Sequence, residues 1–382
     1  MTSATSGLPG GRLPIWGAAG STGVGWEGQR RLRRMGPVTF GVTLPRPWVT
    51  RQELTAGTSL KLRWVADDAI VLSPLRSSSQ GSNRPIEVGP AEGGEALFRR
   101  LVAAYVRGVE LISVRSPSRL RPSFRSTVQE FLQRTVQTTI VEESERQLTV
   151  GDVAQGEALP VARTVRRMGE LTIDLHERAH AVLKSPLAVS EPPWERLDQD
   201  VDRYAWFVER RIAQAWRAGA AAPDGSVDPL GDLLMARALE RAADHAVQLG
   251  LHAGRLGARE PNGSLRALFL RHHRQTIDLL QRCLSIWAEP NPRAANDAID
   301  HGEALRRGSS AVRERLFLEA DRIVPSGLWA LILESIDRTI AYATDIAEVA
   351  LDRTTGPDPR PIRPASPPRA AITVRNLARQ RR

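Results

Sequence analysis

Apolar residues recur at helical spacing through the second half of the chain, from about residue 160 to residue 353. Breaks rich in Pro, Gly and Asn divide this region, and such residues end helices or start turns. The spacing is that of helices with one buried face. The pattern predicts six helices, over residues 161–184, 193–218, 228–255, 263–287, 291–319 and 326–352.

The last three predicted helices repeat the first three. Residues 172–175, TIDL, return unchanged at 276–279, which is 104 residues later. Further matches are Asp202 with Asp300, 98 residues on, and Glu240 with Asp337, 97 residues on. The spacing between matching residues therefore changes by a few residues along the repeats, as loops of different length would cause. We therefore expect a mainly α fold with two tandem three-helix bundles, over residues 160–256 and 263–353.

The pattern near the N-terminus is that of strands. Val38, Phe40, Val42 and Leu44 alternate with small or polar residues, and a second alternating run follows at 60–64. A short helical turn fits between them at 48–52, and a polar turn leads on to a strand at 70–72. The order over residues 28–75 is strand, strand, short helix, strand, strand. A unit this small buries little apolar surface by itself, so we expect a second copy as its partner.

The remaining segments complete the predicted organisation. Residues 85–150 predict a small α/β connector with helices at 96–108 and 123–134 and strands at 111–114 and 138–142. Residues 1–27 and 355–382 show no apolar periodicity, and we expect both to be disordered.

Composition narrows the protein class. No stretch approaches 18 apolar residues in a row, so we expect no membrane-spanning helix, and the N-terminus lacks the pattern of a secretory signal. One cysteine in 382 residues excludes an internal disulfide framework and a cysteine-based zinc site. We expect a cytoplasmic protein.

The net charge of +10 is concentrated in two segments. Residues 28–75 carry +5 and residues 355–382 carry +6, which leaves the rest of the chain close to neutral. This placement favours contact with nucleic acid, although a solvated basic arm is an alternative for the C-terminal segment. The candidate phosphate-contacting residues are Arg30, Arg31, Arg33, Arg34 and Arg46.

Two acidic pairs stand four residues apart on neighbouring predicted helices. Asp198 and Asp202 share one helix face, and Glu240 and Asp244 share another. If the helices pack side by side, four carboxylates converge, and a bound cation would remove their repulsion. The alternative is a solvated acidic face paired with nearby arginines. In the second repeat, Asn296 with Asp300 and Asp337 with Ala341 predict only a weak second site.

A further motif, HERAH at residues 176–180, fits the H-E-x-x-H frame of zinc hydrolases. Such a site also needs a third metal ligand and an open cleft. We interpret the motif as a chance match. The alternative, a zinc hydrolase, requires that the purified protein retains zinc and that His176→Ala loses it.

The acidic stretches resemble those of the PhoU family of phosphate-uptake regulators. The resemblance lies in ARALERAADHAVQLG at 236–250, DQDVDRY at 198–204 and SIDRTIAYATDIAE at 335–348. It implies tandem three-helix bundles that bind a multivalent metal ion (iron, zinc, magnesium or manganese) through Asp198, Asp202, Glu240 and Asp244. It also implies a regulator rather than an enzyme, acting with a phosphate ABC transporter or its signalling kinase.

The N-terminal segment resembles the AbrB/SpoVT family of swapped-hairpin DNA-binding domains. The residues that carry this resemblance are LRRMGPVTFGVTLPRPWV at 32–49 and LTAGTSLKLRWVADDAIVLSP at 54–74. Residues 97–120 and 138–150 are similar to the connector of archaeal proteins that join such a domain to a PhoU-like part. The resemblance implies an interleaved homodimer that contacts DNA. The competing hypothesis is a dimeric scaffold that docks on a transporter or kinase without binding DNA.

Overall fold

The computed structural model describes residues 29–66, 69–74, 85–152, 159–185, 193–217, 226, 228–256, 263–318 and 326–355. The segments expected to be disordered, residues 1–27 and the tail beyond residue 355, lie outside the described residues. Two compact units divide the chain: residues 1–61 with 73–75, and residues 62–72 with 76–382.

The first unit contains a small hairpin and one short helix. Strands β1 (Arg33–Arg34) and β2 (Phe40–Gly41) pair antiparallel, and α1 (Arg46–Arg51) follows. The strand predicted over 38–44 is therefore shorter than expected. Val38, Phe40 and Val42 are exposed, so in the single chain these alternating apolar residues have no surface to pack against.

Strands β3 (Leu60–Ala66) and β4 (Ala69–Pro74) form a two-stranded sheet of their own. Both were expected from the alternating apolar residues. Together with β1, β2 and α1 they give the predicted order of strand, strand, short helix, strand, strand.

The connector is a four-stranded sheet covered by two helices, α2 (Gly94–Val106) and α3 (Pro122–Gln133). The strand order is β5 (Ile86–Glu87), β6 (Leu111–Arg115), β8 (Gln147–Asp152) and β7 (Thr138–Glu143). Strand β5 runs parallel to β6, and the other neighbours pair antiparallel. Strands β5 and β8 were not predicted. Buried Leu97, Tyr105 and Phe131 lie in the core between helices and sheet.

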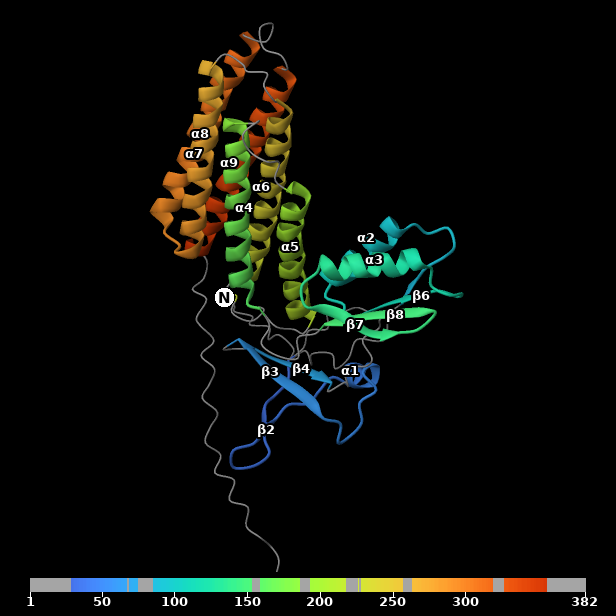
Figure 1. Ribbon diagram of the computed structural model, residues 1–382. Helices are drawn as coiled ribbons and strands as arrows, with labels where there is room; N and C mark the ends of the chain where they lie inside the picture. Colours follow the sequence, from blue (N-terminus) through green and yellow to red (C-terminus); the bar gives the residue numbers. More distant parts are fainter. Residues whose placement is uncertain are drawn as a thin grey trace, which may run out of the picture. The chain divides into compact units, whose positions relative to one another are not determined.

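Six long helices occur where the apolar pattern predicts them (Figure 1). None of the described helices is both long enough and apolar enough to cross a membrane. The helices are α4 (Val161–Lys184), α5 (Trp194–Arg217), α6 (Pro229–Leu256), α7 (Gly263–Ala288), α8 (Pro292–Leu318) and α9 (Ser326–Thr355).

The two three-helix repeats share one apolar core rather than enclosing two. Helix α4 packs against its counterpart α7, and α6 packs against its counterpart α9. Helices α5 and α8 each pack on the other two helices of their own repeat. A single cluster of buried apolar side chains runs through all six helices. Corresponding helices of the two repeats thus pack on each other, as they do in an arrangement with approximate twofold symmetry.

Burial sets the register of the repeats and corrects one sequence match. Buried positions on α5 recur as buried positions on α8 exactly 104 residues later, so Asp202 corresponds to Arg306 and not to Asp300. The six-residue difference is about 9 Å along a helix axis. The matched buried pairs are Val201 with Leu305, Ala205 with Ser309, Val208 with Val312 and Ile212 with Leu316.

Arg210 joins α5 to the connector. It is 2% exposed, and its Nη1 donates to the carbonyl oxygens of Tyr105 at 3.1 Å and Val109 at 2.8 Å. Its guanidinium lies 4.7 Å from the centre of the Tyr105 ring and 3.6 Å from Asp152. A buried cation with several polar partners holds the two parts together only while all its partners are in place.

We expect Arg210→Ala to lower the free energy of unfolding by about 2–4 kcal/mol, because the carbonyls of Tyr105 and Val109 lose this hydrogen-bond donor inside the protein. Urea denaturation of the full chain measures this loss. The exposed Arg217 on the same helix is the matched control, and Arg217→Ala should change the free energy by less than about 0.5 kcal/mol. Equal effects of the two substitutions would contradict this role.

Candidate metal centre

The four predicted carboxylates meet between α5 and α6. Asp202, Glu240 and Asp244 each offer an oxygen that lies within 4.8 Å of the other two. Asp198 joins them through a side-chain hydrogen bond with Asp244. All four are half-buried, because they occupy the edges of helix faces whose centres are apolar and fully buried. The i, i+4 spacing on two adjacent helices is what brings them together.

The nearby arginines leave most of this negative charge without close neutralisation. Arg134, which follows α3, places Nη2 3.8 Å from an Asp202 oxygen, beyond hydrogen-bond distance. Arg237 is 2.8 Å from Glu209 but 3.9 Å from Glu240. Arg237 is therefore bound more closely to Glu209 than to the cluster.

The electrostatic cost of the cluster is visible in its pKa values. Burial raises the pKa of Asp198 to about 6, and the Asp202 charge adds to the shift. Burial also raises the pKa of Asp202 to about 6, with Glu240 and Asp244 as further causes. For Asp244, burial and the charges of Glu240 and Asp198 raise the pKa to about 7. Near neutral pH, part of the cluster holds protons that a cation would displace.

The residues present fit a hard multivalent cation. Glu240 Oε2 is buried and accepts no hydrogen bond from any described residue. Such an atom is costly unless a ligand satisfies it. Carboxylate oxygens on two facing helices are the ligands that magnesium, manganese and calcium prefer, while zinc sites favour nitrogen and sulfur.

The second repeat does not reproduce this arrangement. Asp337, the counterpart of Glu240, forms an ion pair with Arg313. Asn296 is exposed and donates its amide to the Pro292 carbonyl at 2.8 Å, and Asp300 is also exposed. Neither Asn296 nor Asp300 lines the cavity beside Asp337. The residues that do so were missed because the α8 register was read from a single acidic residue.

The HERAH motif lies inside the protein and lacks the geometry of a hydrolase. His176 is fully buried, and its Nε2 donates to the Ala242 carbonyl at 3.0 Å while Nδ1 faces His273 Nε2 at 3.2 Å. Glu177, the residue that would act as general base, is bound through both oxygens to Arg274. Both nitrogens of His176 are engaged within the protein, so the frame match is a packing feature.

The histidines instead form a hydrogen-bonded chain that sequence reasoning missed. Since the Ala242 carbonyl can only accept, His176 accepts at Nδ1 from His273 Nε2–H. His273 then accepts at Nδ1 from His180, at 3.3 Å. Burial lowers the pKa of His176 to about 4 and that of His273 well below its usual value, which keeps both rings neutral.

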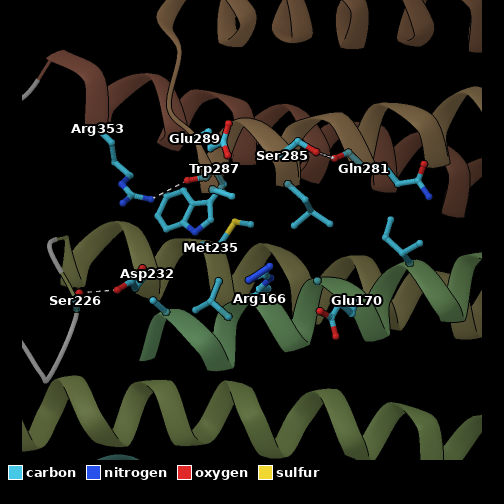
Figure 2. A pocket seen from close by; sticks show the side chains of 16 residues that line it. Arg166, Glu170, Ser226, Asp232, Met235, Gln281, Ser285, Trp287, Glu289 and Arg353 are labelled. Carbon is cyan, nitrogen blue, oxygen red and sulfur yellow. Dashed lines mark hydrogen bonds between the residues drawn. The ribbon is translucent and has the colours of Figure 1, made fainter. Parts of the chain in front are cut away.

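A cavity of about 910 Å³ lies among α4, α6, α7 and α9 (Figure 2). Its wall is mainly apolar, and two of its charged side chains are bound to the protein. Arg353 covers the Trp287 ring at 4.0 Å and donates to the Trp287 carbonyl, and Asp232 accepts from Ser226 at 2.5 Å. The cavity offers room for an apolar molecule but no converging set of ligands.

The five candidate DNA-binding arginines are all exposed in the first unit. Arg33 and Arg34 form β1, and Arg46 begins α1. Arg34 is held in place by hydrogen bonds to the carbonyls of Gly36 and Pro37. Arg30 and Arg31 precede the strand. Exposure on a small unit suits contact with phosphate groups.

We expect the cluster to make the metal-free protein less stable as pH rises. The pKa values of Asp198, Asp202 and Asp244 are raised above the unfolded value of 3.8, so the folded state binds more protons between about pH 4 and pH 7. Stability therefore falls as pH rises through this window. With a chelator present at pH 7.5, Asp244→Asn should raise Tm by about 2–4 °C, and by much less at pH 5.

The measurement is the difference in Tm between variant and wild type, because buried histidines with lowered pKa values act in the opposite direction in both proteins. Asp200→Asn is the control, since Asp200 lies on α5 and pairs with Arg203 at 3.6 Å. A difference profile for Asp244→Asn that is flat with pH would contradict the electrostatic account.

The solved structures similar to this chain include two PhoU proteins. PhoU from Pseudomonas aeruginosa matches with a TM-score of 0.45 and 19% identity, over 52% of this chain and 96% of that chain. The phosphate transport system regulatory protein PhoU from Streptococcus pneumoniae matches with a TM-score of 0.46 and 14% identity, over 52% and 94%. No family model matches the chain, and no curated protein does. Because the identities are this low, function is inferred from this chain's own residues.

Proposed function

We propose that this chain is a metal-binding regulator of phosphate uptake and phosphate homeostasis, whose N-terminal unit forms a homodimer that binds DNA. The observation that carries the metal-binding part is the convergence of Asp202, Glu240 and Asp244 within 4.8 Å. The protein acts by binding and not by catalysis.

The chemistry of the cluster supports a bound cation. Like charges at this separation repel, and the arginines that offset them, Arg134 and Arg237, lie at 3.8 and 3.9 Å, beyond hydrogen-bond distance. The three converging oxygens would coordinate a multivalent cation. The cation would also satisfy Glu240 Oε2, which accepts no hydrogen bond from the described residues. Of iron, zinc, magnesium and manganese, the all-oxygen set suits zinc least.

The phosphate-related part rests on the sequence. Residues 198–204 and 236–250, which resemble the motifs of the PhoU family, are the two segments whose acids meet in the cluster. Motif and geometry therefore coincide at one place. A phosphate ABC transporter or its signalling kinase is the partner that this resemblance favours.

The DNA-related part rests on the surface of the first unit. Its arginines are exposed, as are Val38 at 89% and Phe40 at 59% of their surfaces. The exposed apolar residues support dimerisation, because a second copy of the unit would cover them. The exposed arginines beside them support contact with DNA phosphates. The alternative is a dimeric scaffold that docks on the transporter or kinase without DNA.

We expect the metal-free full chain to bind one Mn²⁺ ion in the first repeat, and Asp244→Ala to weaken this binding about tenfold or more, because it removes a converging oxygen. Calorimetric titration measures the affinity and stoichiometry. Asp200→Asn removes an acid of the same helix and should bind like the wild type. Equal affinity of wild type and Asp244→Ala would remove the metal site from the proposal.

We expect the full chain to bind duplex DNA with an affinity that falls steeply with salt. Replacement of Arg30, Arg31, Arg33 and Arg34 by Ala should reduce the slope of log K against log salt by about 3 to 4 units, because each phosphate contact releases counterions. Fluorescence anisotropy measures binding, and light scattering checks that the oligomeric state is unchanged.

The control carries the same loss of charge at exposed connector positions, with Arg99, Arg115, Arg119 and Arg146 replaced by Ala. It should retain most of the wild-type slope. If both quadruple variants bind DNA equally well, the four N-terminal arginines are not the DNA contact. If the wild type does not bind DNA at all, the scaffold alternative holds instead.

A further inference from the structure

The cavity beside Asp337 occupies the same position in the second repeat that the carboxylate cluster occupies in the first. Buried positions on α9 recur 97 residues after those on α6, and buried positions on α8 recur 104 residues after those on α5. By this register, Asp337 replaces Glu240, and Ala341 replaces Asp244. Across the groove, Arg306 replaces Asp202.

The same register shows that the charge of the site is reversed. Glu209, which lies about two turns beyond Asp202 on α5, is replaced by Arg313 on α8. Arg241 is kept as Arg338 on α9. An acid cluster bordered by arginines has thus become an arginine cluster that retains one central acid.

The cavity has a volume of about 530 Å³ and an excess of positive charge. It is lined by four arginines, two acids, one hydroxyl and one methyl group: Arg306, Arg307, Arg313, Arg338, Glu303, Asp337, Ser310 and Ala341. The formal charge of these side chains is +2. The excess charge is what a doubly charged anion would neutralise.

The two carboxylates that line the cavity pair with only two of its four arginines. Arg313 pairs with Asp337, and Arg307 lies 3.6 Å from Glu303. Arg338 donates to the Tyr342 hydroxyl at 2.7 Å, which orients its guanidinium without neutralising it. Neither Arg306 nor Arg338 forms an ion pair with a carboxylate of the described residues, although the charge of Asp345 interacts with both at longer range. Two guanidinium groups from facing helices are therefore available to a ligand.

We propose that this cavity binds a phosphoryl oxyanion, either free phosphate or the phosphoryl group of a larger molecule. Arg306 of α8 and Arg338 of α9 supply charged forks that match its oxygens, and the Ser310 hydroxyl is a further donor. Arg313 and Asp337, which pair with each other, also line the cavity. Ala341 leaves open the space that a carboxylate fills in the first repeat. The volume also accommodates a chain of two or three phosphoryl groups.

This inference goes beyond the proposed function, because it assigns a ligand to the second repeat that does not depend on metal in the first. It also predicts that a substitution in one site leaves ligand binding at the other site unchanged. Asp244→Asn should weaken metal binding while anion binding stays within about twofold of the wild type.

The test is calorimetric titration of the metal-free full chain with inorganic phosphate, pyrophosphate and ATP, with sodium sulfate as a comparison anion. We expect saturable binding of at least one phosphoryl ligand. Arg306→Ala and Arg338→Ala should each weaken it about tenfold or more, because each removes a charge-assisted pair of hydrogen bonds. The exposed Arg293 on α8 does not line the cavity, and Arg293→Ala should bind like the wild type.

The source of the anion follows from the ranking of the ligands. Tightest binding of inorganic phosphate identifies the free ion, and tightest binding of pyrophosphate or ATP identifies a phosphoryl group of a larger molecule. Wild-type affinity in both Arg306→Ala and Arg338→Ala would overturn the proposal. So would sulfate binding as tight as that of every phosphoryl ligand, or no binding of any of them at millimolar concentration. Thermal unfolding of each variant verifies that it is folded.

Discussion

One shared apolar core fixes how the six long helices of this protein pack, and thereby where their polar side chains lie. Because α4 packs on α7 and α6 on α9, the two repeats bury their apolar faces against each other and keep the same register. The contact between α5 and α6 and the contact between α8 and α9 are then lined by corresponding residues, at corresponding positions along the helix axes. At these contacts a substitution changes charge without disturbing the core, so the duplicated scaffold can carry two different sites.

The two sites differ in how their charge is balanced. In the first repeat, burial and the neighbouring acidic charges raise the pKa values of Asp198, Asp202 and Asp244, and Arg134 and Arg237 remain at 3.8–3.9 Å from the cluster. In the second, Arg313 pairs closely with the one remaining acid, while Arg306 and Arg338 carry excess positive charge. A cation suits the first balance and an anion the second. The proposed regulator would hold ligands of opposite charge on the two directly packed helices α6 and α9.

Much of this fold could be predicted from the sequence, because helical periodicity and helix breakers are local signals. The six long helices lie within a few residues of their expected ends, and the i, i+4 pairs of α5 and α6 do converge. What escaped prediction depends on contacts between distant segments. His176 meets His273 across 97 residues, and the α8 register was misread because Asp300 matched Asp202 in kind but not in burial. Strand β8, which pairs with both β6 and β7, was likewise missed.

The most direct test of the central claim is a crystal of the full chain soaked in Mn²⁺ and measured for anomalous scattering. The account predicts one strong anomalous peak between α5 and α6, within coordination distance of Asp202, Glu240 and Asp244, and none beside Asp337. A peak beside Asp337, or the absence of one at the carboxylate cluster, would contradict the division of the scaffold into a cation site and an anion site.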